Sequence, residues 1–185
     1  MNRFFKRSVL TDENRKNAGV SLVEIVIVCA IFAVLAGGLA LSINAVKGAD
    51  VTKATRNIES NYAKLRTHTM SQTGDWELVV YEKEDMYYSV VRRDGVDYGT
   101  VLELGEYVNI SYKDDVGTVY SVDADNPLSI SLRPSTGAVN RVNVGTAIVY
   151  DTSANSESSY GTIEITRKKK TSTLKFYYIT GKVVK

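Results

Sequence analysis

Few residues in this chain of 185 have the chemistry that catalysis needs. His68 is the sole histidine and Cys29 the sole cysteine, so a triad built on histidine would have to use His68. The sequence also lacks a histidine and cysteine cluster with metal-site spacing and a glycine loop that could cradle phosphate. We expect His68 to be a polar residue on a helix surface. The sequence therefore predicts neither an enzyme nor a cofactor.

Acidic residues gather in one stretch and could offer oxygen ligands to calcium. They are Asp114, Asp115, Asp123 and Asp125, with Asn126 beside them. Within this set Asp123 and Asp125 are the weak calcium candidates. Such residues more often form turns, and the sequence favours that interpretation, so no metal is predicted.

One dense run of cations, Arg167, Lys168, Lys169 and Lys170, lies between two candidate strands. Four adjacent cations raise the local concentration of anions. The run could contact an anionic cell wall, DNA or another surface, and a solvated loop is the default interpretation. The net charge of the chain is only +2. A nucleic-acid partner is therefore possible, but the overall charge gives no argument for one.

The apolar stretch from Val20 to Val46 decides on which side of a membrane the rest of the chain is expected to lie. It holds one ionisable side chain, Glu24. At about 1.5 Å per residue a helix of this length crosses a hydrocarbon core of roughly 30 Å. Residues 1–19 carry five cations against two acids, which predicts a cytoplasmic amino terminus and export of the remainder. The sequence thus predicts a single-pass membrane protein with an extracellular carboxy-terminal domain.

This stretch resembles the class III signal of type IV pilins and pseudopilins. The resemblance is carried by Gly19, the apolar Val20, then Ser21-Leu22-Val23-Glu24 and a long apolar run. It implies that prepilin peptidase removes the leader, residues 1–19, by cutting after Gly19, and that the new amine of Val20 is methylated. Valine departs from the phenylalanine or methionine that is usual there.

An ordinary secretory signal is the alternative interpretation of the same stretch. Gly38-Leu39-Ala40 offers small residues for a cleavage site after the apolar run. Two features count against this alternative. Glu24 places a carboxylate inside the apolar core, and the helical pattern continues past Ala40.

Glu24 and the glycine pair are the candidate assembly residues. A carboxylate in hydrocarbon costs several kcal/mol unless it is paired or neutral. The methylated amine of Val20 in a neighbouring subunit could pair with Glu24 and set the axial register, or Glu24 could remain wet at headgroup level. Gly37 and Gly38 allow close helix packing or, as a helix-loosening site, local melting during extraction.

The helix is predicted to continue from the membrane into an exported domain. An apolar stripe with helical spacing occupies residues 47–73, and the first strong stop is Thr73-Gly74-Asp75. The stripe consists of Val51, Ala54, Ile58, Tyr62, Leu65 and Thr69. The sequence therefore predicts one helix from about Val20 to Gln72, with a transmembrane first half (20–46) and an amphipathic second half (47–73).

Residues 74–185 change to a pattern typical of strands separated by turns. The candidate strands are residues 77–81, 87–92, 101–104, 107–112, 117–122, 128–132, 138–142, 146–150, 161–166, 174–179 and 183–184. A loop is expected at residues 167–173. The predicted fold class is α+β, a long N-terminal helix packed on a mostly antiparallel β domain.

The function implied by the resemblance is a structural subunit, a pilin or a minor pilin or pseudopilin of a type IV pilus-like filament. Its expected partners are prepilin peptidase, other pilin subunits, an assembly platform with its ATPase, and the lipid bilayer. Residues 129–139 and 178–183 resemble strand endings of minor pilins and H-type pseudopilins. The alternative is a non-polymerising, single-pass membrane-anchored binding or adhesion protein outside the cell. Adhesion, motility, DNA uptake and secretion all stay open.

Overall fold

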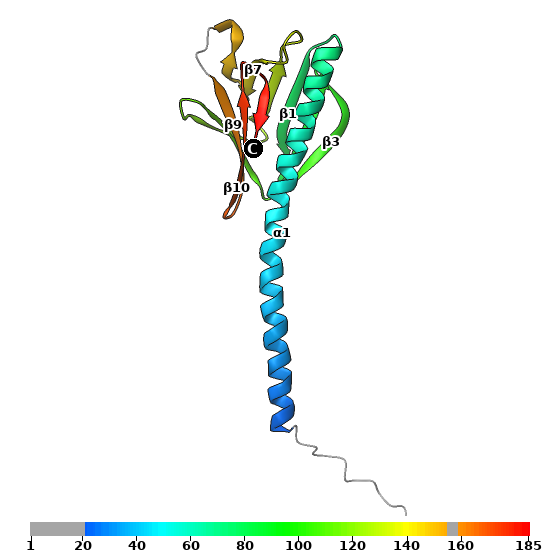
Figure 1. Cartoon of the computed structure of the whole chain (residues 1–185), viewed down its shortest axis with the longest axis vertical. Helices are drawn as coiled ribbons and strands as arrows, with labels where there is room; N and C mark the ends of the chain where they lie inside the picture. Colours follow the sequence, from blue (N-terminus) through cyan, green and yellow to red (C-terminus); the bar gives the residue numbers. More distant parts are fainter. Residues whose placement is uncertain (1–20, 155–158) are drawn as a thin grey trace, which may run out of the picture. The chain divides into compact units, whose positions relative to one another are not determined.

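The structure is a computed structural model that describes residues 21–154 and 159–185, with the side chains of residues 36–49 and 154 outside the description (Figure 1). The chain divides into two compact units, Met1–Ser42 and Ile43–Lys185. The leader, residues 1–19, and Val20 therefore lie outside the described residues.

The second unit confirms the predicted apolar stripe on helix α1 (Leu22–Ser71). Val51, Ala54, Ile58, Tyr62, Leu65 and Thr69 are each at most 4% exposed. Two polar residues on the buried side are hydrogen-bonded, as buried polar groups usually are: Asn61 Nδ2 donates to the Ser89 carbonyl at 2.9 Å, and the Thr55 hydroxyl donates to the Val51 carbonyl at 2.7 Å. The helix ends two residues before Thr73-Gly74, as the stop signal predicts.

No helix within the described ranges is both long and apolar enough to cross a membrane. The membrane span predicted for residues 20–46 includes Val20 and eleven positions, 36–46, that lie outside the described side chains. The span stays a prediction.

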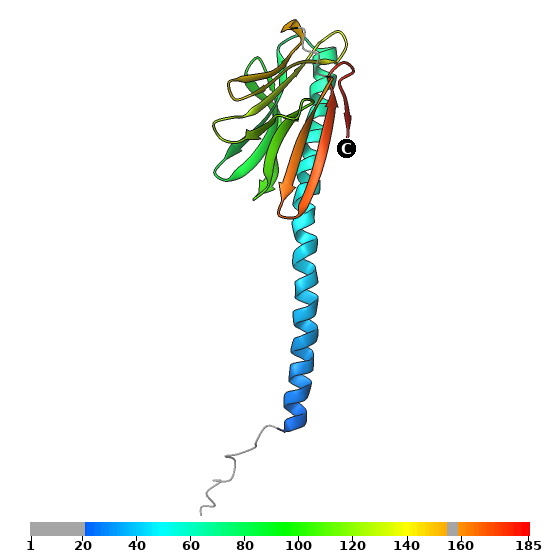
Figure 2. The same cartoon turned by 90° about the vertical axis from the view of Figure 1, so that its left-hand side faces the viewer.

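In the described part of the chain eleven strands form two antiparallel sheets, which confirms the α+β class. The first sheet has the order β3-β2-β1-β6-β7-β8 and the second β11-β10-β9-β4-β5. The strands are β1 (Trp76–Lys83), β2 (Met86–Arg93), β3 (Val96–Glu106), β4 (Asn109–Asp114), β5 (Val119–Val122), β6 (Leu128–Leu132), β7 (Val139–Val144), β8 (Ala147–Asp151), β9 (Tyr160–Arg167), β10 (Lys170–Tyr177) and β11 (Lys182–Val184). A short 3₁₀ turn, η1 (Thr152–Ala154), follows β8. Figure 2 shows the strands alongside the cyan part of α1, which belongs to the same unit.

Most strand boundaries differ by a few residues from the prediction, and the starts of β10 and β3 differ most. The loop expected at residues 167–173 contains just Lys168 and Lys169, because Arg167 pairs with Lys170 and the threonines and serine that follow continue the ladder. Strand β3 begins at Val96 rather than Val101, since the two-residue turn Asp94-Gly95 has positive φ at both positions and returns the chain directly onto β2.

The core lies where the two sheets and the helix meet. Alternate residues of β1 and β6, such as Leu78, Leu128 and Ile130, are fully buried and join one apolar cluster with Ile58 of the helix. The other residues of these strands, including Glu77, Ser129 and Ser131, point to the opposite face of the six-stranded sheet. That face is therefore polar where β1 and β6 lie side by side.

Candidate functional site

The amino-terminal part of α1 is an uncovered apolar surface. Every described side chain from Ser21 to Leu35 is exposed, and Leu22, Phe32 and Val34 are exposed by 66–78%. The backbone N–H of Ile25 donates to the Ser21 carbonyl at 3.1 Å, so helical bonding starts at Ser21. Cys29 in this stretch is a free, exposed thiol.

Glu24 lies in the first turn of this apolar surface. A carboxylate in the first turn interacts favourably with the partial positive charge of the helix amino terminus. None of the ion pairs found among the described residues includes Glu24. Gly19 and Val20, the processing and methylation residues of the prediction, lie outside the described residues. Gly37 and Gly38 lie within α1, and both hypotheses for them stay predictions.

A comparison with protein families bears on this segment. A family model described as the prokaryotic N-terminal methylation motif matches residues 14–40. The chain carries a prokaryotic N-terminal methylation motif. The matched residues include Gly19, Val20 and Glu24, so the methylation motif supports a type IV pilin-like class III signal at this end of the chain. No curated protein and no solved structure matches the chain.

The basic run is divided by the fold, which corrects the prediction of one solvated patch of four cations. Arg167 ends β9 and forms an ion pair with Asp50 of α1, with 18% of the arginine side chain exposed. Lys168, Lys169 and Lys170 are exposed at the tip of the β9–β10 hairpin. No local pattern indicates this pairing, because the two partners are more than one hundred residues apart in sequence. Three cations are left for contact with an anion.

The acidic residues form turns. Asp123 Oδ1 accepts hydrogen bonds from the backbone N–H groups of Asp125 and Asn126 at 3.0 and 2.8 Å. Asp114 Oδ1 accepts from the Thr118 N–H at 2.7 Å. Each of these carboxylates closes a local turn, as acids at such positions commonly do. In the part of the chain that the structure describes, no group of three or more His, Cys, Asp or Glu residues could hold a metal ion.

His68 is more than the exposed polar residue that the sequence predicts. Its ring stacks on Trp76 with centroids 4.8 Å apart and meets Tyr98 edge-on at 5.1 Å. The Nδ1 atom is buried and has no hydrogen-bond partner in the described part of the chain. The histidine therefore closes the end of the helix against β1 and β3. The sequence signal that could have predicted this contact is a helix stop a few residues before Trp76.

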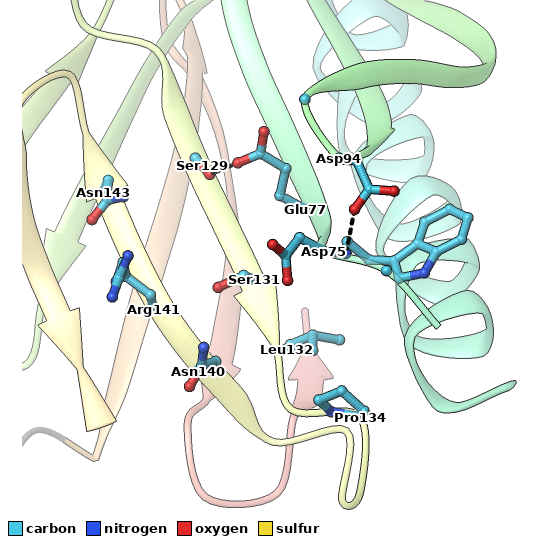
Figure 3. A pocket seen from close by; sticks show the side chains of 13 residues that line it. Asp75, Glu77, Asp94, Ser129, Ser131, Leu132, Pro134, Asn140, Arg141 and Asn143 are labelled. Carbon is cyan, nitrogen blue, oxygen red and sulfur yellow. Dashed lines mark hydrogen bonds between the residues drawn. The ribbon is translucent and has the colours of Figure 1, made fainter. Parts of the chain in front are cut away.

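A polar groove of about 660 Å³ on the outer face of the six-stranded sheet was not predicted (Figure 3). Figure 3 shows its two walls, with Ser129 and Ser131 of β6 between them. One wall holds Asp75, Glu77 and Asp94, and the other holds Asn140, Arg141 and Asn143. In sequence these residues look like an ordinary solvated strand face, and the sheet pairing is what brings them together.

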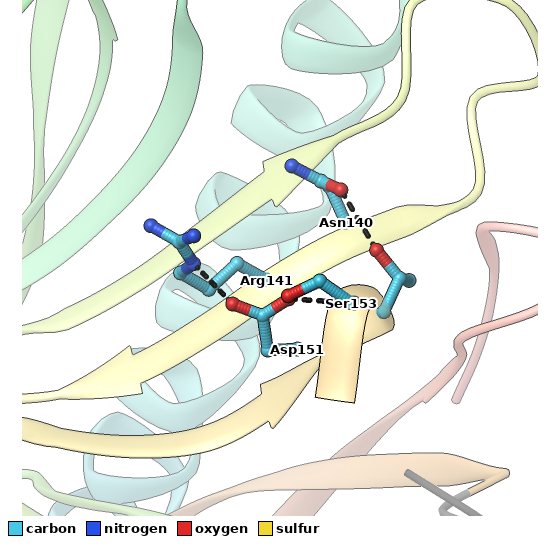
Figure 4. Close-up of polar contacts among 5 residues, drawn as sticks. Asn140, Arg141, Asp151 and Ser153 are labelled. Atoms are coloured by element: carbon cyan, nitrogen blue, oxygen red, sulfur yellow. Dashed lines mark hydrogen bonds and ion pairs between the residues drawn. The ribbon is translucent and has the colours of Figure 1, made fainter. Parts of the chain in front are cut away.

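The Arg141 wall is held by a small polar network (Figure 4). Arg141 Nε lies 2.9 Å from Asp151 Oδ2. Asp151 Oδ1 accepts from both the hydroxyl and the backbone N–H of Ser153, and these hydrogen bonds, with Arg141, lower the pKa of the Asp151 carboxyl to about 2. Asn140 Oδ1 accepts from the Thr152 hydroxyl at 3.0 Å. The network leaves the terminal amino groups of Arg141 and the amide N–H groups of Asn140 available to the groove.

Proposed function

We propose that the chain is a structural subunit of a type IV pilus-like filament, processed and N-methylated after Gly19 and assembled through its N-terminal helix. The carrying observation is that the methylation motif at residues 14–40 coincides with a helix segment whose described side chains are all exposed. A continuous apolar helix surface needs cover, either from lipid or from other helices. A subunit that moves from the bilayer into a filament is covered first by lipid and then by the helices of other subunits.

The partners of this function follow from its two stages. In the membrane stage the chain is a single-pass protein in the lipid bilayer, with a cytoplasmic amino terminus and an extracellular carboxy-terminal domain, and prepilin peptidase removes residues 1–19. In the assembly stage other pilin or pseudopilin subunits and a platform with its ATPase move it into a surface filament. The role is structural, with no catalysis by this chain.

Glu24 is the residue that we assign to register. Lipid and neighbouring helices are equally apolar, so subunit association depends on packing and polar contacts rather than on hydrophobic transfer. An unpaired carboxylate in that environment is costly, and the methylated amine of Val20 in a neighbour would relieve the cost at one axial position. Glu24 has no ion-pair partner among the described residues, which fits a partner in another subunit.

The test compares Glu24→Ala with Glu59→Ala, the same substitution on the second-unit part of the same helix. Both variants should be inserted and cleaved like the wild type, as checked by intact mass. We expect Glu24→Ala to reduce the yield of sheared surface fibres at least tenfold and Glu59→Ala to leave it unchanged. Normal fibre yield from a cleaved Glu24→Ala protein would contradict the register role.

A minor subunit is the finer proposal. The strand endings at residues 129–139 and 178–183 support it by resemblance. Immunogold labelling of fibres should then mark their ends rather than the shaft, and labelling along the whole shaft would show a major subunit.

A non-polymerising, membrane-anchored binding protein is the second candidate function. The polar groove on the six-stranded sheet favours it, because a pure filament subunit has no need of such a site. A cellular protein that keeps residues 1–19 and never enters fibres would support this candidate over the first.

A further inference from the structure

The groove on the six-stranded sheet owes its shape to short side chains between long ones. In the ladder register, Glu77 lies opposite Ser131, and Ser131 lies opposite Arg141. The three residues form a row across β1, β6 and β7, with adjacent strands about 4.8 Å apart. Glu77 and Arg141 are therefore about 10 Å apart at the backbone. No ion pair joins them among the described residues, and the serine leaves open space between them.

In the row next to it, the apolar Val79 of β1 lies opposite Ser129. Ser129 lies opposite Asn143, and the Ser129 hydroxyl donates to the Glu77 carboxylate. Asn143 Oδ1 is buried and has no hydrogen-bond partner among the described residues. A buried acceptor without a donor is unfavourable.

Several other polar side-chain groups that line the groove have no hydrogen-bond partner among the described residues. The Asp75 side chain is exposed, while its backbone N–H donates to Asp94 Oδ1. Arg141 uses its Nε atom for Asp151, which leaves its two terminal amino groups. These groups, the Ser131 hydroxyl and the Asn140 amide provide both donors and acceptors.

The chemistry of the walls excludes several classes of ligand. The lining holds the carboxylates of Asp75, Glu77 and Asp94 and one guanidinium, Arg141. Arg141 is paired with Asp151 and Asp94 with Arg93, so two carboxylates without an ion-pair partner among the described residues remain, and phosphate and nucleic acid are disfavoured. The apolar side chains of the lining are Trp76, Leu132 and Pro134, and of these Trp76 and Leu132 are buried, which disfavours a lipid. No cluster of three metal-binding side chains occurs in the described ranges.

An extended peptide that adds to the sheet is also excluded. β1 pairs with β2 and β6, β6 with β1 and β7, and β7 with β6 and β8. Their backbone N–H and C=O groups are therefore already engaged in the ladders, and the groove lies on a sheet face rather than on an edge. Recognition has to come from side chains.

We propose that this groove binds an oligosaccharide of amino sugars that carry free ammonium groups. The ammonium would lie at Asp75 and Glu77, and ring hydroxyls would bond to Ser131, Asn143 and the free donors of Asn140 and Arg141. The volume of about 660 Å³ falls within the range of about 300–1,000 Å³ that small-molecule sites occupy. The site belongs to the second unit and does not depend on polymerisation.

The test is calorimetric titration of the full chain in detergent with glucosamine trimer, its fully N-acetylated form, and trilysine. We expect the glucosamine trimer to bind at least tenfold more tightly than the acetylated trimer, because acetylation removes the cations. Ser131→Leu, which fills the floor of the groove, should weaken binding at least tenfold, and Asp75→Asn at least threefold.

Two matched variants keep the result specific. Ser111→Leu makes the same change on β4 of the other sheet, and Asp125→Asn makes the same change in an exposed turn. Both should bind like the wild type, with all variants melting at similar temperatures. Absence of trimer binding, equal effects of Ser131→Leu and Ser111→Leu, equal binding of the acetylated trimer, or trilysine binding as tightly at this site would each overturn the proposal. Glu24→Ala should bind normally, which separates this result from a failure of the filament proposal.

Discussion

The phenol oxygens of Tyr112 and Tyr178 lie 2.5 Å apart in the core, where β4 meets the segment that follows β10. Both tyrosines are fully buried, and Tyr178 stacks on Tyr150 with ring centroids 4.0 Å apart. Beside them, the Tyr62 hydroxyl of α1 donates to the Gly181 carbonyl at 3.1 Å. The tyrosines thus connect the helix, the five-stranded sheet and the last turn of the chain.

Alkaline pH should unfold the protein through this pair. Burial raises the pKa of Tyr178 to about 12, although the hydrogen bond with Tyr112 opposes the shift, and burial raises the pKa of Tyr112 as well. An unfolded tyrosine loses its proton near pH 10, so the native state binds more protons above that pH. Stability is complete below pH 10 and falls as pH rises toward 12.

The measurement is urea unfolding at pH 8, 10, 11 and 12. Between pH 10 and 12, Tyr178→Phe should reduce the loss of unfolding free energy by about 1.4 kcal/mol per pH unit, since one titrating group is removed. Tyr107→Phe, at a position that is 73% exposed, should leave the slope unchanged. Equal slopes for wild type and Tyr178→Phe would show that this tyrosine does not titrate with folding.

Gly161→Ala should be strongly destabilising. A Cβ atom at this position would overlap the phenol oxygens of Tyr112 and Tyr178, and inserting atoms into a packed core costs about 1–3 kcal/mol or more. Thr173→Ala, at an exposed position of the adjacent strand β10, is the control and should change the free energy of unfolding by well under that amount. A loss no larger than that of the control would mean that the tyrosines move apart at little cost.

The ion pair of Arg167 with Asp50 should stabilise the β9–β10 hairpin against the helix. Both side chains are partly buried, so removing one partner leaves a charge with poor solvation. We expect Arg167→Ala to lower the free energy of unfolding by about 1–2 kcal/mol and to speed amide hydrogen exchange in β9 and β10. Lys169→Ala, at the exposed tip of the same hairpin, should stay within about 0.5 kcal/mol of the wild type. Equal free energies of unfolding for Arg167→Ala and Lys169→Ala would show that the ion pair does not contribute to stability.

The helix stripe offers a direct test of the packing that the sequence predicts. Ile58 is completely buried, and truncation to alanine should cost about 2–5 kcal/mol in urea unfolding. Lys53→Ala, on the exposed side of the same helix, should cost little. Similar losses for both variants would place the stripe outside the core.

Local patterns predicted most of the elements, and long-range pairing decided the rest. The spacing of Val51, Ile58 and Leu65 is sufficient to identify a buried helix face, because it follows from the 3.6-residue period alone. Strand alternation and turn residues likewise predicted where the strands lie. No local rule places β6 between β1 and β7, so the row of Glu77, Ser131 and Arg141 could not be foreseen. The same holds for Arg167 and Asp50.

The proposed assembly requires that residues 1–19 are removed and that Val20 becomes a methylated amino terminus. Intact-mass measurement of the protein from its native cells, with sequencing of the amino-terminal peptide, tests this directly. We expect a chain that starts at Val20 and carries one added methyl group. A cellular protein that still begins at Met1, or that begins after Ala40, would contradict it.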